Sequence, residues 1–163
     1  MARFSVLLVS IILTLNSSVK ADDAQSQTPV QAIEIYLDAF NDRSANDKKE
    51  AIFHFPQIWI IGGEVKIYDT PPTTLISYDN LETSGWAYSK AHSIETLSEG
   101  KNTAVVSLDF SRFTEEHKEM LRTVAFYSMI KKGDKWKIAT ITVASSIPIL
   151  EKPNASIKEP NRD

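Results

Sequence analysis

Four long runs rich in β-branched and aromatic residues fill almost all of the chain between residues 86 and 147. Such residues favour extended strands. The connections between the runs are short and polar, and the last of them, Lys132-Gly-Asp134, is typical of a tight hairpin turn. The sequence therefore predicts a four-strand antiparallel meander, with strands at residues 86–97, 103–113, 121–131 and 135–147.

Helical patterns and one short hairpin precede this meander. Thr28 and Pro29 are typical of a helix start, because Thr caps free N–H groups and Pro suits the first helical position. Apolar residues then recur at helical spacing from Val30 to Phe40. The pattern further predicts a second helix at residues 48–53, a hairpin with strands at 58–61 and 65–68, and a third helix that starts near residue 69 and ends at Gly85.

The order of these elements indicates one α+β domain. The helices of the first half have apolar sides that must be buried, and the sheet offers the matching surface. We therefore expect a helix–helix–hairpin–helix–meander chain. Its N-terminal helices are expected to pack in the concave face of a strongly bent antiparallel sheet and to leave a hollow.

The first 21 residues predict a cleaved signal peptide. Arg3 supplies a positive charge, residues 4–15 form a nearly unbroken apolar run, and Val19 and Ala21 are the small residues that a signal peptidase prefers. The run is shorter than the roughly 20 apolar residues of a spanning helix; an uncleaved anchor is the alternative. We expect export, to the periplasm or out of the cell. The mature parts are a flexible leader at 22–29, the domain at 30–147 and a polar tail at 148–163.

Composition and charge exclude several classes of protein. The chain has no cysteine, which excludes a disulfide scaffold and a thiol nucleophile. Its net charge is −3 with both signs mixed along the chain, whereas a nucleic-acid interface needs clustered Lys and Arg. The three histidines are far apart in sequence, so we expect no metal site and no cofactor. No segment after the signal peptide is apolar enough to be expected to span a membrane.

Three segments resemble the nuclear transport factor 2-like superfamily. Residues 32–42 (AIEIYLDAFND) look like the family's first helix and its exit, residues 53–56 (FHFP) like the start of the following strand, and residues 133–138 (GDKWKI) like its final hairpin. The resemblance covers about residues 30–147 and implies a cystatin-like cone. The superfamily includes ketosteroid isomerases, SnoaL-type polyketide cyclases and non-catalytic binding domains, so a shared fold leaves the function open.

The resemblance to the steroid isomerases implies three catalytic parts: a carboxylate base, a tyrosine and a protonated carboxylic acid. Tyr36 falls where the tyrosine is expected. The base position falls at residues 60–62, which offer no carboxylate, and the second acid falls near Phe126, which cannot donate a hydrogen bond. Because one part of three is present, we interpret Tyr36 as a core residue, with a catalytic role as the alternative.

Two strands decide which other side chains face the hollow. Tyr88 and His92 share one face of a pleated strand, and if that face lines the cone they meet a ligand beside Trp59 and Phe126. The alternative is that they lie outside, in solvent or in a dimer interface.

In the next strand, Val106, Leu108 and Phe110 alternate with polar residues and are expected to face the hollow. Asp109 then lies on the wetter side, on the face opposite to that of Arg112, which weakens Asp109 as an acid/base.

The leading hypothesis is an exported domain, non-enzymatic or cryptically active, that holds a small apolar or aromatic molecule in the cone. The expected lining is Tyr36, Trp59, Tyr88, His92 and Phe126. One alternative is a lyase, isomerase or cyclase with His92 or Asp109 as acid/base. Another is an assembly module whose own side chains fill the cone. Since the outer sheet face is expected to expose Val105 and Phe113, a homodimer is expected as well.

Overall fold

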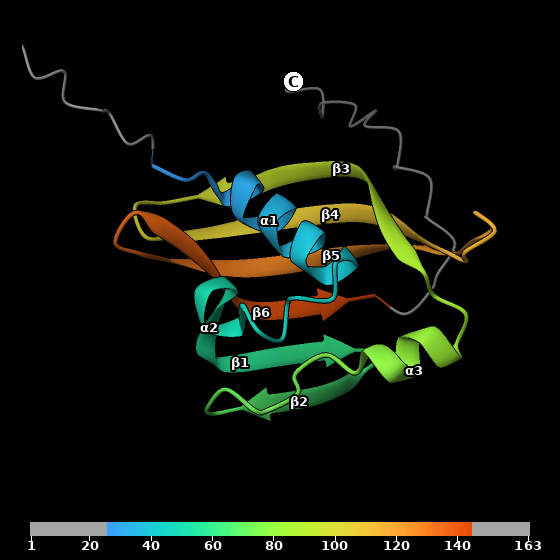
Figure 1. Ribbon diagram of the computed structural model, residues 1–163. Coiled ribbons are helices and arrows are strands. Elements are labelled where there is room, and N and C mark those ends of the chain that lie inside the picture. Colours follow the sequence, from blue (N-terminus) through green and yellow to red (C-terminus); the bar gives the residue numbers. More distant parts are fainter. Residues whose placement is uncertain (1–25, 145–163) are drawn as a thin grey trace, which may run out of the picture.

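Residues 26–144 are described by a computed structural model of the chain, so the predicted signal peptide, residues 22–25 of the leader, residues 145–147 of the predicted domain and the tail lie outside the described residues. The elements are α1 (Pro29–Asn41), α2 (Lys49–Ile52), β1 (Phe53–Ile61), β2 (Glu64–Tyr68), α3 (Tyr78–Thr83), β3 (Tyr88–Glu99), β4 (Thr103–Phe113), β5 (Glu119–Lys132) and β6 (Lys135–Val143). This order confirms the predicted α+β class (Figure 1).

The strands form one bent sheet in the order β2-β1-β6-β5-β4-β3. From β3 to β6 each strand pairs antiparallel with the next, which confirms the predicted meander. β1 and β6, however, run parallel, with Trp59 opposite Ile141 and Ile61 opposite Val143. The sheet is therefore mixed and not wholly antiparallel as predicted. The parallel pair joins the N-terminal hairpin to the meander, and a local sequence pattern cannot indicate which distant strand β1 will join.

Helix α1 packs on the sheet, against β3, β4 and β6 (Figure 1). A capping box fixes its start: the main-chain N–H of Gln31 donates to Thr28 Oγ1 at 3.2 Å, and that of Thr28 donates to Gln31 Oε1 at 2.8 Å. Ile33, Tyr36 and Phe40 recur at helical spacing and are buried. The cap and the apolar stripe are the two features from which the sequence predicts this helix.

The third helix begins later than predicted, at Tyr78. The loop before it is held by Asn46. The Oδ1 atom of Asn46 accepts hydrogen bonds from the main-chain N–H groups of Leu75 and Ile76 at 3.0 and 2.9 Å, and its Nδ2 donates to the carbonyl of Ile76 at 2.8 Å. These side-chain contacts satisfy backbone groups that a longer helix would have paired internally.

The core lies between α1, α2 and the inner face of the sheet. Its fully buried apolar side chains include Ile33, Phe53, Leu108, Met129 and Ile138. Among the described residues, no helix is long and apolar enough to cross a membrane.

Candidate ligand-binding cavity

The cone is not filled by its own side chains, because a cavity of about 670 Å³ lies within it. That volume falls within the range of small-molecule sites. Most of the lining is aromatic or aliphatic: Tyr36, Leu37, Phe40, Trp59, Ile61, Tyr68, Leu75, Ile76, Leu81, Leu108, Phe110, Tyr127, Ile141 and Val143. A hollow of this size contradicts the filled cone that the assembly-module hypothesis predicts.

The strand register explains how distant residues meet on one wall. Residues directly opposite each other on neighbouring strands share a face of the sheet. Lys66, Trp59, Ile141, Tyr127 and Val106 form one such row, each opposite the next, across five strands. This row runs along the inner face, so the hairpin and the meander contribute to the same wall.

Tyr36 lies among other aromatic rings and is 7% exposed. Its ring meets those of Phe53, Tyr127 and Phe40 edge to face, with centroid distances of 5.5, 5.8 and 6.0 Å. Burial raises the pKa of the Tyr36 phenol above its ordinary value, and burial does the same to the pKa of Tyr127. Both phenols are therefore neutral O–H groups near neutral pH.

Arg112 is the cation on the inner face of β4. It continues the alternation of Leu108 and Phe110 and lies opposite Ser89 of β3. Its guanidinium carbon is 5.9 Å from the centroid of the Phe40 ring, within the range of a cation–π contact. Burial lowers the pKa of Arg112, opposed by Tyr36 and Tyr127. A guanidinium nevertheless stays protonated near neutral pH.

The exposed part of the lining forms a rim. Its members all belong to one segment of the chain: Ile61, Glu64, Lys66, Thr74, Ser77 and Asn80. They come from the β1–β2 hairpin, the loop that Asn46 holds, and α3. Glu64 and Lys66 carry opposite charges, so the rim adds no net charge to the site.

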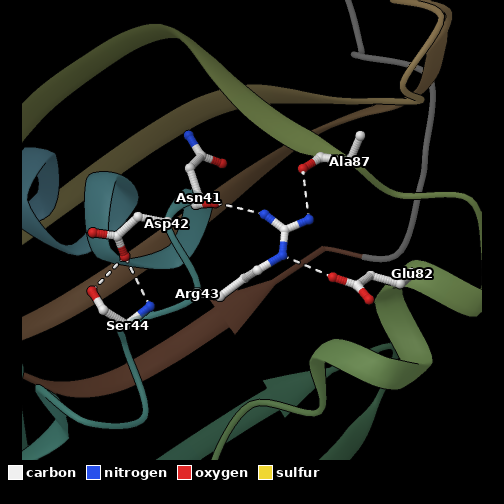
Figure 2. A network of polar contacts seen from close by, with 6 residues as sticks. All are labelled: Asn41, Asp42, Arg43, Ser44, Glu82 and Ala87. Atoms are coloured by element: carbon white, nitrogen blue, oxygen red, sulfur yellow. Dashed lines mark hydrogen bonds and ion pairs between the residues drawn. The ribbon is translucent and has the colours of Figure 1, made fainter.

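A network at the end of α1 anchors the wall that α3 provides. Figure 2 shows Arg43 donating from Nε to Glu82 of α3 at 2.7 Å, and from its terminal nitrogens to the carbonyls of Asn41 and Ala87 at 3.0 and 3.5 Å. Its guanidinium carbon is also 5.1 Å from the Trp86 ring centroid. One side chain thus joins the end of α1, α3 and the segment leading into β3.

Two of the five predicted lining residues lie at the cavity, and three lie elsewhere. Tyr36 and Trp59 line the cavity. Tyr88, His92 and Phe126 lie on the outer face of the sheet instead, which corrects their predicted placement. There, the ring of Tyr88 stacks on that of Phe113 with centroids 5.0 Å apart.

A bulge in β3 causes the misplacement in that strand. Ala91 pairs with an inner residue of β4 and Ser93 with an outer one, so His92 is an extra residue without a partner opposite. An extra residue reverses the alternation of faces. Tyr88 and Ile94 are an even number of positions apart, so an unbroken strand would place them on the same face. Because of the bulge, Tyr88 points outward, whereas Ile94 pairs with an inner residue.

His92 takes part in a hydrogen-bond chain on the outer face. Its Nε2 is 2.7 Å from Ser111 Oγ, and Ser111 Oγ donates to Glu119 Oε1 at 2.7 Å. The single hydroxyl proton goes to Glu119, so Ser111 accepts from His92. A serine nucleophile needs the reverse direction, with histidine as the acceptor.

Asp109 is engaged on the same outer face. Arg122 donates to its two carboxylate oxygens at 3.0 and 2.8 Å. These hydrogen bonds lower the pKa of Asp109. Its outer placement agrees with the strand alternation, and it has no access to the cavity. Within residues 26–144, no group of three His, Asp or Glu side chains is placed to hold a metal ion.

Among the lining residues that were not predicted, Arg112 and Tyr127 are the ones with polar groups on the inner face of the meander that the binding argument uses. The alternation from Val106 to Phe110 in β4 extends to Arg112, so the signal for this residue was present in the sequence. In β5, both Phe126 and Tyr127 are aromatic, and only the register, with Tyr127 opposite Val106, decides which one faces inward.

Comparison with solved structures shows the fold. A nuclear transport factor 2-like protein with a cystatin-like fold from Novosphingobium aromaticivorans has a TM-score of 0.57 and 12% identity, over 72% of this chain and 79% of that one. A nuclear transport factor 2-like protein from Pseudomonas putida has a TM-score of 0.54 and 12% identity, over 74% and 85%. A hexachlorocyclohexane dehydrochlorinase from Novosphingobium barchaimii has a TM-score of 0.54 and 13% identity, over 69% of this chain and 80% of that one.

The chain therefore has the nuclear transport factor 2-like, cystatin-like fold, as its sequence resemblance implies. No protein-family model matches the sequence, and no curated protein matches it significantly. At these identities the likeness establishes the fold alone, because one fold serves many chemistries.

Proposed function

We propose that this chain is a binding domain that holds one small, largely apolar or aromatic molecule in its cone. The observation that carries the proposal is the cavity of about 670 Å³, walled by aromatic and aliphatic side chains and bordered by an exposed rim. Apolar walls with a few polar groups are the usual composition of small-molecule sites. The first 21 residues alone support the further proposal that the domain works after export.

A binding role is preferred to catalysis because of the ionisable groups at the cavity. Glu64, the one carboxylate among the described lining residues, is exposed at the rim. The two acid/base candidates of the enzyme hypothesis, His92 and Asp109, lie on the other side of the sheet. The dehydrochlorinase shares the fold of this chain at 13% identity, and its activity is not transferred to this chain on that basis.

A cavity-filling substitution tests this function. Leu37 of α1 is half-buried in the lining, whereas Ile35 on the same helix is 50% exposed. We expect Leu37→Trp to weaken binding of the neutral apolar fluorophore N-phenyl-1-naphthylamine by about tenfold or more, because one buried side chain then occupies ligand space. Ile35→Trp is the matched control and leaves the affinity unchanged. Equal affinities in both variants, or no binding by the unaltered protein, contradict the proposal.

Native mass spectrometry of the purified protein provides an independent test. A cavity of this composition is expected to retain a small molecule through gentle purification, seen as a mass excess that disappears on unfolding. The same excess in Leu37→Trp at full occupancy contradicts binding inside the cone.

A second copy of the chain is proposed to cover the outer face of the sheet. Val65, Ile60, Thr142 and Phe126 form one row across that face, each opposite the next. Val65 and Phe126 are 60% and 40% exposed. Exposed apolar side chains that lie together on one face often mark a protein–protein interface. We expect a dimer in sedimentation at micromolar concentration and a monomer after Val65→Lys; a monomeric unaltered protein overturns this proposal.

A further inference from the structure

The charge of Arg112 has no counter-charge within the described structure. The ion pairs of residues 26–144 join Arg43 to Glu82, Lys48 to Asp42, and Arg122 to Asp109. The Nε of Arg112 is fully buried and makes no hydrogen bond to any described residue. A guanidinium carries five N–H donors, so the side chain is far from satisfied.

Arg112 is half-buried, and a cation that is partly withdrawn from water loses hydration that no ion pair replaces. The cation–π contact with Phe40 offsets only part of that loss. Arg122, on the outer face of the neighbouring strand, shows the usual arrangement, since both oxygens of Asp109 accept from it. At the inner face, an acceptor in the cavity, whether water or a ligand, can reach the guanidinium through its terminal nitrogens, which are not among the fully buried atoms without a partner.

The neighbours of Arg112 favour an acceptor-only group. Tyr36 and Tyr127 line the same cavity as Arg112. Because burial keeps both phenols protonated, each presents an O–H donor. Neither hydroxyl donates to another described side chain or carbonyl. An ionised carboxylate, which only accepts hydrogen bonds, matches a forked cation and two O–H donors.

We infer that the cavity binds an aromatic carboxylate, with its charged group against the guanidinium of Arg112 and its apolar body among the rings of the cone. The inference rests on the proposed binding function and narrows it to one class of ligand. Apart from Lys66 at the exposed rim, Arg112 is the single cation of the described lining, and the rim charges of Glu64 and Lys66 cancel, so the ligand carries one negative charge.

The test compares matched ligands that differ in charge alone. Isothermal titration calorimetry on the purified protein uses 2-naphthoate, 4-phenylbenzoate and indole-3-acetate, each beside its neutral primary amide. We expect at least one carboxylate to bind about 10- to 100-fold more tightly than its amide, the range of hydrogen bonds to a charged group. Arg112→Met removes that preference and leaves the affinity of the amide within about twofold.

Two further variants separate the roles of charge and geometry. Arg112→Lys keeps the charge without the planar fork, so part of the preference is retained. Arg122→Met, on the outer face, leaves both affinities unchanged. If carboxylates and amides bind alike, or only amides bind, the inference is overturned while the binding function stands. If the neutral fluorophore and both ligand classes fail to bind, the binding function itself is overturned.

Thermal unfolding without ligand supplies a readout independent of binding. Replacing a half-buried cation that has no ion pair by an apolar side chain of similar length is expected to leave the Tm unchanged or to raise it. A decrease of more than about 4 °C in Arg112→Met shows that the guanidinium has a structural partner within the protein, and overturns the inference.

Discussion

The side chain of Asn41 and the backbone of Ser89 are joined by two hydrogen bonds of 2.8 Å. Asn41 Nδ2 donates to the Ser89 carbonyl, and the Ser89 N–H donates to Asn41 Oδ1. The side-chain amide therefore pairs with β3 as a neighbouring peptide group would. Since Ser89 lines the cavity and Asn41 ends α1, this pair sets the distance between the helix and the wall of the cone.

We expect Asn41→Ala to lower the free energy of unfolding by about 1–3 kcal/mol, because it leaves the backbone N–H and C=O of Ser89 without partners. Urea unfolding measures this loss. Asn102→Ala, at an exposed position between β3 and β4, is the control and is expected to change stability by less than about 0.5 kcal/mol. Equal effects of the two substitutions would show that the Asn41 pair contributes nothing.

Asn46→Ala tests whether one amide holds the loop that walls the cavity. We expect loss of about 1–3 kcal/mol of stability. We also expect faster hydrogen exchange at the amides of Leu75 and Ile76, which donate to Asn46, with unchanged exchange at Val106 in β4. Retained protection of the two loop amides would contradict the assignment.

The ion pair of Asp109 and Arg122 predicts a pH-dependent effect on stability. The folded-state pKa of Asp109 is lowered below its ordinary value of 3.8, so the stabilisation is present above that value and is lost as pH falls through the lower folded-state pKa. Because the pair is partly exposed, Asp109→Asn is expected to lower the Tm by only about 1–4 °C at pH 7. The difference in Tm between Asp109→Asn and the unaltered protein should disappear at pH values below the folded-state pKa of Asp109. A difference in Tm that does not depend on pH contradicts this explanation.

Asp109→Asn and His92→Gln also discriminate between the functional hypotheses. Both side chains lie on the outer face, so neither substitution is expected to change ligand affinity by more than about twofold. Titration with the best-binding carboxylate measures this. Loss of binding in either variant would place a ligand site on the outer face and argue against the cone.

Expression of the full chain in a secreting host tests the predicted signal peptide. We expect the exported protein to begin at Asp22, since Val19 and Ala21 form the small-residue cleavage pattern. N-terminal sequencing gives the result. A mature product that retains Arg3 contradicts cleavage and favours the uncleaved anchor.

The order of elements could be predicted because each rests on a local signal. Thr28 and Pro29 mark the start of α1, and the turn at Gly133 joins the last two strands. The late start of α3 could not be predicted, because it depends on hydrogen bonds from Asn46, which lies 30 residues from Ile76. The parallel pairing of β1 with β6 depends in the same way on contacts between distant segments.

The candidate site was predictable only where the strand alternation was unbroken. β4 is regular from Val106 to Phe110, and its inner face follows from the sequence. In β3, the bulge at His92 reverses the faces, and no turn residue marks it. In β5, adjacent Phe126 and Tyr127 are both aromatic, so composition does not distinguish the inner residue from the outer one.

The exposed rim has a consequence for how such a protein can diversify. Its members lie between residues 61 and 80, one uninterrupted stretch, whereas the guanidinium and the phenols deeper in the cone come from other elements. Exchanging that single stretch would change the shape of the cavity entrance, and with it the size of ligand that can enter, while the residues that recognise charge in the interior stay unchanged. Selectivity for shape and selectivity for charge are thus encoded in separate parts of the chain.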